Sequence, residues 1–104
     1  MLKLHSEFTQ VYNRAKNAHS SGAVIFFLPI TEKKVGFTAT KKIGNAVTRN
    51  RSKRRLRAMF MEFAPHLANG SYVFVAKQNT ATMPFDRLRA EFEKSLKYLR
   101  AIER

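Results

Sequence analysis

Basic side chains are the residues of this sequence most able to do chemistry, and they are concentrated in one segment. Between Lys33 and Met61 there are 10 Lys and Arg residues and no Asp or Glu, whereas the other 75 residues carry 10 basic and 7 acidic side chains. Guanidinium and ammonium groups at this density bind phosphates, and the planar guanidinium also stacks on bases. With a formal net charge of +13 over 104 residues, the chain is expected to bind a polyanion, nucleic acid before an anionic membrane surface.

The residues that a protein-centred nuclease needs are scattered along the chain. Hydrolysis of RNA by a polypeptide requires clustered carboxylates or paired histidines that hold metals or move protons. No such cluster is present among the acids and histidines, which are Glu7, Glu32, Glu62, Asp86, Glu91, Glu93, Glu103, His5, His19 and His66. The absence of Cys excludes disulfides, thiolate zinc sites and a cysteine nucleophile. We therefore predict neither a catalytic residue nor a metal site on the polypeptide itself.

The elements that must position the basic segment follow from hydrophobic periodicity and turn residues. The expected fold class is α+β, with residues 1–104 forming a single domain in which helices pack on a four-stranded sheet. Residues 17–22 are rich in turn formers and leave room for a short strand. Pro84 can occupy the first turn of the last helix, and Phe85, Leu88, Phe92, Leu96 and Leu99 line one side of that helix. The expected order is helix–three strands–helix–strand–helix, with helices over 7–16, 46–63 and from 84 onward, and strands within 17–22 and over 23–28, 35–40 and 71–76.

The helix predicted over residues 46–63 is both amphipathic and strongly basic. At about 100° per residue, one arc of about 100° holds its large apolar residues, which can seat the helix on a sheet. These residues are Leu56, Met59, Phe60 and Phe63. Arg and Lys residues cover most of the remaining circumference, and no Glu at i,i+4 relieves their mutual repulsion. A polyanion would remove this electrostatic penalty. A merely solvated basic face is the plainer interpretation, and a membrane-surface helix is disfavoured because the core needs the apolar arc.

A sequence motif spans the start of this helix and the residues before it. It closely resembles the Arg-Asn-Arg signature of the protein subunit of bacterial ribonuclease P, and the resemblance extends over nearly the whole chain. The residues that carry it are Lys41-Lys42-Ile43-Gly44-Asn45-Ala46-Val47-Thr48-Arg49-Asn50-Arg51-Ser52-Lys53-Arg54. Ser52 and Arg55 depart from the family pattern, because many relatives have aliphatic residues there.

The resemblance implies two RNA partners, the catalytic RNA of ribonuclease P and precursor tRNA, from which the holoenzyme removes the 5′ leader. In the family the RNA holds the Mg²⁺ ions and performs the chemistry. The resemblance also implies a left-handed strand–helix–strand crossover, which handedness rules alone would not predict. Carried over by position, the leader-binding cleft holds Phe8, Tyr12 and Phe26. The face against the catalytic RNA comprises Lys41, Lys42, Asn45, Arg49, Asn50, Arg51, Lys53, Arg54 and Arg57.

Other functions stay open on the residues alone. The first alternative is a noncatalytic module that binds structured RNA, like a ribosomal protein. The second is a DNA-binding domain, although Asn50 is the only exposed amide on the helix that can read adenine. No apolar run is long enough to span a bilayer and no signal-peptide pattern opens the chain. We therefore expect a cytoplasmic protein with no membrane partner; the sequence does not specify an oligomeric state.

Overall fold

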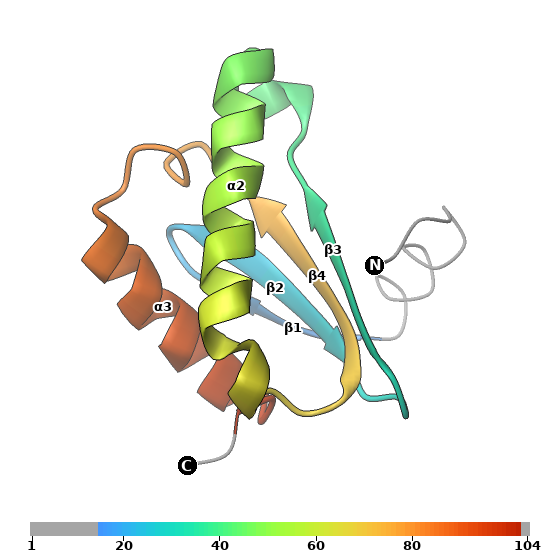
Figure 1. Cartoon of the computed structure of the whole chain (residues 1–104). Coiled ribbons are helices and arrows are strands. Elements are labelled where there is room, and N and C mark those ends of the chain that lie inside the picture. The colour runs from blue at the N-terminus through green and yellow to red at the C-terminus, as the bar shows by residue number, and fades with distance from the viewer. Residues whose placement is uncertain (1–14, 103–104) are drawn as a thin grey trace.

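A four-stranded sheet is the scaffold of the molecule. The computed structural model describes residues 15–102. The strands are β1 (Lys16–His19), β2 (Ala23–Leu28), β3 (Lys33–Thr38) and β4 (Gly70–Ala76), and their order in the sheet is β1-β2-β4-β3. β2 runs antiparallel to both of its neighbours, β1 and β4, whereas β3 and β4 are parallel. Figure 1 shows this sheet behind two long helices.

Two helices lie on one face of the sheet. α2 (Ala46–Phe63) has the predicted bounds, and α3 (Phe85–Tyr98) follows Pro84, which is the N-cap residue and not part of the first turn as predicted. Two short 3-10 helices, η1 (Lys41–Ile43) and η2 (Ala64–His66), flank α2. α2 packs against β3 and β4, and α3 packs against β1 and β2. None of the helices in residues 15–102 has the length and apolar character needed to cross a membrane.

The core lies between the sheet and these helices and is largely aromatic. The Tyr72 ring stacks on the Phe27 ring with centroids 4.9 Å apart, and the Phe74 ring stacks on Phe92 at 5.4 Å. Complete burial of each such ring contributes about 1.5–3 kcal/mol. The Tyr72 hydroxyl donates a hydrogen bond to the Ala68 carbonyl at 2.5 Å, and burial raises the pKa of this phenol. The Phe60 ring of α2 packs against this layer, with centroids 6.2 Å from Tyr72 and 5.7 Å from Phe74, so the layer supports α2.

The connection from β3 through α2 to β4 is left-handed, as the family resemblance implies. In Figure 1, α2 lies in front of the sheet, both strands run toward the top, and β4 lies to the left of β3. Most crossovers between parallel strands have the opposite hand. This crossover places the first turn of α2 beside η1, directly after the C-terminal end of β3.

Three further local predictions, besides that for Pro84, were wrong. Lys16 belongs to β1 and not to the first helix; the rest of the predicted helix 7–16 lies outside the described residues. β3 begins at Lys33 and ends at Thr38, two residues before the predicted end. Phe85 does not line the buried side of α3, because its side chain is exposed. Lys16 pairs with Phe27 of β2, and the pairing of β3 with β4 ends at Thr38. The Phe85 ring lies against the guanidinium groups of two arginines and not in the core.

Candidate nucleic-acid interface

The predicted RNA-contacting residues occupy η1 and the outward side of α2, and we refer to them as the basic face. A tight turn joins the two parts at Gly44, whose φ of 140° is strained for any residue with a side chain. Asn45 then caps α2, because its Oδ1 accepts a hydrogen bond from the Thr48 N–H at 2.9 Å. The turn and the cap hold the η1 lysines beside the first turn of α2. The basic face comprises Lys41, Lys42, Asn45, Arg49, Asn50, Arg51, Lys53, Arg54 and Arg57.

The apolar arc of α2 fixes which side of the helix faces outward. Leu56, Met59, Phe60 and Phe63 are buried, as their spacing predicts. Ser52 lies on the same arc and is fully buried, and its hydroxyl donates to the Thr48 carbonyl at 2.9 Å. The departure from an aliphatic residue at this position therefore leaves no unsatisfied hydroxyl in the core.

The cations of the basic face are accessible and lack acidic partners in the part of the chain that the structure describes. Of the basic-face side chains on α2, Arg49 and Lys53 are half-buried and the others are exposed. Within residues 15–102, no acidic side chain forms an ion pair with any cation of the basic face. The guanidinium of Arg57 lies 5.5 Å from the centroid of the Phe37 ring, which orients it without neutralising it. Their charges are therefore available for an external anion.

The N-terminal end of α2 adds to this positive potential. Its first turn contains no acidic residue, and the free backbone N–H groups of a helix start favour negative charge. η1 places Lys41 and Lys42 next to this helix end, and both side chains are exposed. The helix dipole, the lysines and the arginines thus all make the potential at this surface more positive.

Arg55 has a different role from the arginines of the basic face. Its guanidinium donates to the Thr80 carbonyl at 2.8 Å and lies 5.5 Å from the Phe85 ring centroid. Arg89 lies 5.3 Å from the same centroid and pairs with Glu62 of α2 at 2.7 Å. These contacts join α2 to α3 and to the loop before it. The sequence analysis did not predict this cluster. Its one signal in the sequence is Phe85, an aromatic residue at the start of α3; only the fold places the ring between arginines of two helices.

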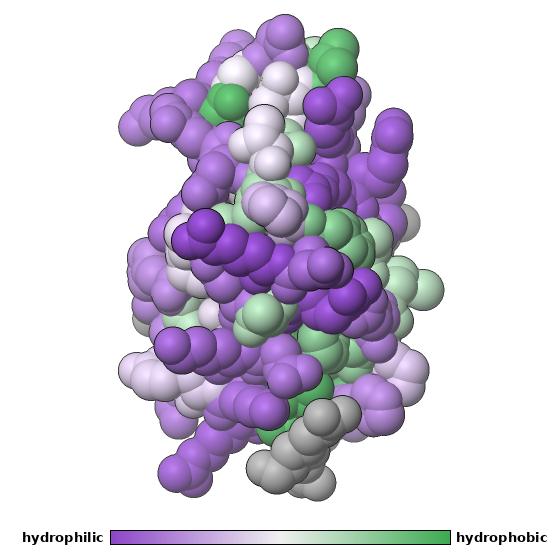
Figure 2. Space-filling view, turned by 90° about the vertical axis from the view of Figure 1, so that its left-hand side faces the viewer, coloured by the Kyte–Doolittle hydropathy of each residue, from purple (hydrophilic) through white to green (hydrophobic). Residues whose placement is uncertain are grey.

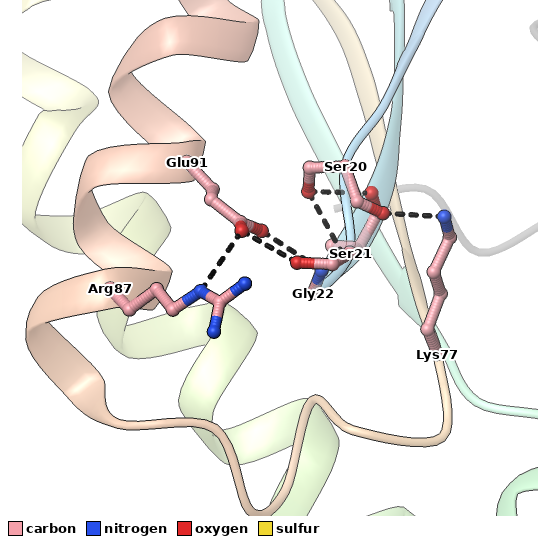
Figure 3. A network of polar contacts seen from close by, with 7 residues as sticks. Ser20, Ser21, Gly22, Lys77, Arg87 and Glu91 are labelled. Atoms are coloured by element: carbon pink, nitrogen blue, oxygen red, sulfur yellow. Dashed lines mark hydrogen bonds and ion pairs between the residues drawn. The ribbon is translucent and has the colours of Figure 1, made fainter.

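A second polar network fixes the hairpin between β1 and β2 to α3 (Figure 3). The Glu91 carboxylate accepts hydrogen bonds from the Ser21 hydroxyl at 2.6 Å and the Gly22 N–H at 3.0 Å, and Arg87 lies 3.6 Å away. Lys77 donates to the Ser20 carbonyl from the other side. Burial on its own would raise the pKa of Glu91, but the hydrogen bonds from the hairpin and the Arg87 charge lower it overall. Glu91 therefore holds the hairpin in place as a carboxylate.

The residues predicted to form a leader-binding cleft are only partly described. Phe26 is half-buried on the sheet face opposite α2 and α3, whereas its neighbour Phe27 belongs to the core. The apolar side chains of Val73 and Val75 lie on the same face as Phe26. Phe8 and Tyr12 lie outside the described residues, so their part in the cleft stays a prediction. No group of three or more His, Cys, Asp or Glu side chains suited to a metal occurs in residues 15–102.

Comparisons with known proteins match nearly the whole sequence. A family model described as Ribonuclease P matches residues 1–100. The ribonuclease P protein component of a Nitratiruptor species is 41% identical over 99 residues, which cover 95% of this chain and 91% of that protein. The corresponding protein of Symbiobacterium thermophilum is 38% identical over 96 residues, covering 88% of this chain and 84% of that protein.

Solved structures share the fold. The RNase P protein of Staphylococcus aureus superposes with a TM-score of 0.85 at 24% identity, covering 98% of this chain and 96% of that chain. The RNase P protein of Thermotoga maritima gives a TM-score of 0.78 at 22% identity, covering 99% of this chain and 97% of that chain. At these identities the structures establish the fold, and the relatives above establish the family. The chain therefore belongs to the ribonuclease P protein family.

Proposed function

We propose that this chain, a protein subunit of ribonuclease P, binds the catalytic RNA of that enzyme through the basic face. The observation that carries this assignment is a continuous set of accessible cations, on η1 and α2, that no acidic side chain within residues 15–102 neutralises. Most of the cations on α2 are arginines, and the planar guanidinium group of an arginine can bind two phosphate oxygens at once. Neutralising closely spaced phosphates would help the RNA hold its active form.

We assign hydrolysis of the phosphodiester bond, and the Mg²⁺ ions it requires, to the RNA. The polypeptide is not the catalytic unit of this ribonucleoprotein enzyme, and its contribution is positive charge and surface. Basic side chains neutralise phosphates that Mg²⁺ would otherwise have to screen. The protein should therefore lower the Mg²⁺ concentration at which the RNA is active. We place this activity in the cytoplasm, where the precursor tRNA of a bacterial cell is made.

We further propose that the single-stranded 5′ leader of precursor tRNA contacts the sheet face that carries Phe26. Aromatic rings stack on any base, so they suit a leader of variable sequence. Phe8 and Tyr12 complete this cleft in the proposal. Replacing Phe8 or Tyr12 by Ala should weaken binding of leader-bearing precursor more than binding of mature tRNA. Equal losses for the two RNAs would contradict stacking on the leader.

Reconstitution tests the assignment directly. Bacterial ribonuclease P RNA and precursor tRNA are mixed at low Mg²⁺, and leader removal is measured with and without the protein. We expect the protein to stimulate cleavage strongly and to be inactive without the RNA. RNA binding without stimulation would favour a noncatalytic structured-RNA module, and cleavage by the protein alone would overturn the assignment of chemistry to the RNA.

A further inference from the structure

An open groove of about 530 Å³ lies between β1 and α3. β1 is at the edge of the sheet remote from β3, so the groove is separate from the basic face, which α2 carries over β3 and β4. One wall is formed by β1 and the hairpin after it, and the other by α3. We call this feature the β1–α3 groove. Its polar and aromatic lining includes Asn17, His19, Glu91, Lys94, Ser95 and Tyr98.

The α3 wall combines an aromatic ring with an exposed cation. Tyr98 is 75% exposed at the end of α3, which is unusual for a large ring. Lys94 lies one turn earlier and is therefore its neighbour on the helix surface. Lys94 is exposed and forms no ion pair with an acidic side chain in residues 15–102. An exposed ring beside an unpaired ammonium is a pair suited to a base and its phosphate.

The remaining lining residues offer hydrogen bonds to the edge of a base. Glu91 is one turn before Lys94 and Ser95, and its oxygens accept two hydrogen bonds from the hairpin and face Arg87. The Ser20 hydroxyl and the Arg87 charge also act on this carboxylate, so its role in the groove is to hold the hairpin wall in place. Asn17 and His19 present donors and acceptors from exposed positions on β1.

We propose that the β1–α3 groove binds one nucleotide of single-stranded RNA. The base stacks on Tyr98, its phosphate contacts Lys94, and its polar edge faces Asn17 and His19 of β1. This inference rests on the proposed function, because it gives the ribonuclease P subunit a third RNA contact, at the edge of the sheet remote from β3. The net charge of +13 and the hydrophilic surface on the α3 side of the molecule (Figure 2) favour RNA over an apolar ligand.

A peptide added as a strand to β1 is the competing occupant. β1 has only four residues, so its free edge offers few backbone hydrogen bonds to an added strand. Strand addition also makes no use of the exposed ring of Tyr98 or of the Lys94 charge. The groove chemistry therefore favours a nucleotide.

The test is an NMR titration of the full-length ¹⁵N-labelled protein with hexacytidylate, a single-stranded RNA whose bases carry both donors and acceptors on their edges. Arg51→Ala and Arg54→Ala are introduced first to weaken RNA binding to the basic face. Chemical shift changes of the groove amides then report RNA binding in the groove itself. We expect the amides of β1 and of the last turns of α3 to shift. Tyr98→Ala should weaken this binding about fivefold or more, and Tyr98→Phe should retain it because stacking remains.

A pair of charge variants separates local contact from general electrostatics. Lys94→Gln should weaken hexacytidylate binding and reduce its salt dependence. Lys97→Gln removes the same charge from the same helix outside the groove, where Lys97 pairs with Glu93 at 3.3 Å, and should have little effect. Equal effects of the two variants would contradict a phosphate contact at Lys94.

Other outcomes overturn the proposal without touching the proposed function. Shifts confined to η1 and α2 or to the sheet face that carries Phe26, or unchanged binding by Tyr98→Ala, would refute the groove site. Concentration-dependent shifts at β1 without RNA would assign the groove to a second copy of the chain. If wild-type protein still stimulates leader removal in the reconstitution, only the groove proposal fails; if stimulation is absent, the proposed function fails regardless of the groove.

Discussion

Removing two exposed arginines from the basic face should change the salt dependence of RNA binding by a calculable amount. Arg51 and Arg54 are exposed and have no ion-pair partner in residues 15–102, so their replacement by Ala should leave the fold intact. The basic face holds seven cations, and each phosphate contact contributes about 0.7–0.9 to the slope of log Kd against log salt concentration. The wild-type slope is then about 5–6 if every cation contacts a phosphate, and the double variant should give about 3.5–4.5.

These slopes translate into affinities that are readily measured. Between about 50 and 200 mM monovalent salt, the wild-type complex should weaken by about 10³–10⁴ and the variant by only about 100–500-fold. The assay is filter binding of ribonuclease P RNA at constant Mg²⁺ over a series of salt concentrations. Thermal unfolding of each protein shows that the comparison is made between folded molecules.

A control variant with the same net charge as the Arg51/Arg54 variant separates the effect of where the cations lie from the effect of total charge. Arg87→Ala combined with Lys97→Ala lowers the formal charge by two, from +13 to +11, as the basic-face variant does, but removes cations of α3 that have acidic neighbours. The control should keep the wild-type slope. An unchanged slope for the Arg51/Arg54 variant, or an equal reduction in the control, would refute a specific RNA contact by the basic face.

Three further predictions address the elements that support this face. Asn45→Ala removes the α2 cap and should lower the free energy of unfolding by about 1 kcal/mol in urea denaturation, whereas Asn45→Asp keeps the cap but should weaken RNA binding; equal stability of all three proteins would contradict the cap. Phe85→Leu removes the ring under two guanidinium groups and should cost about 1 kcal/mol of stability, with RNA affinity per folded molecule unchanged; a selective loss of RNA affinity would place Phe85 in the interface. Glu91→Gln should lower the free energy of unfolding by about 1–2 kcal/mol at neutral pH because a charged acceptor is lost. Since the pKa of Glu91 is lowered in the folded protein from its usual 4.5, the wild-type advantage should be complete above about pH 4.5 and shrink as the pH falls further, and an advantage that grows in acid would contradict this assignment.

Local patterns in the sequence were sufficient to predict α2 and the cations on its outward side. The apolar spacing in residues 46–63 predicted both the bounds of α2 and its buried side, because a helix brings i, i+3, i+4 and i+7 together whatever surrounds it. The charge count predicted the exposed cations of α2, since a dense run of cations without acids is too costly to bury. The Arg-Asn-Arg motif added the family, which composition and periodicity do not specify.

The tertiary structure decided everything that depends on residues distant in sequence. Arg55 and Arg54 are adjacent and chemically identical, yet the Thr80 carbonyl and the Phe85 ring engage Arg55 and leave Arg54 exposed. Strand register decided that Phe27 enters the core and Phe26 the opposite face, because a shift of one residue exchanges the two sides of a strand. The hand of the crossover and the β1–α3 groove likewise arise from how elements pack across the sheet, which no local periodicity records.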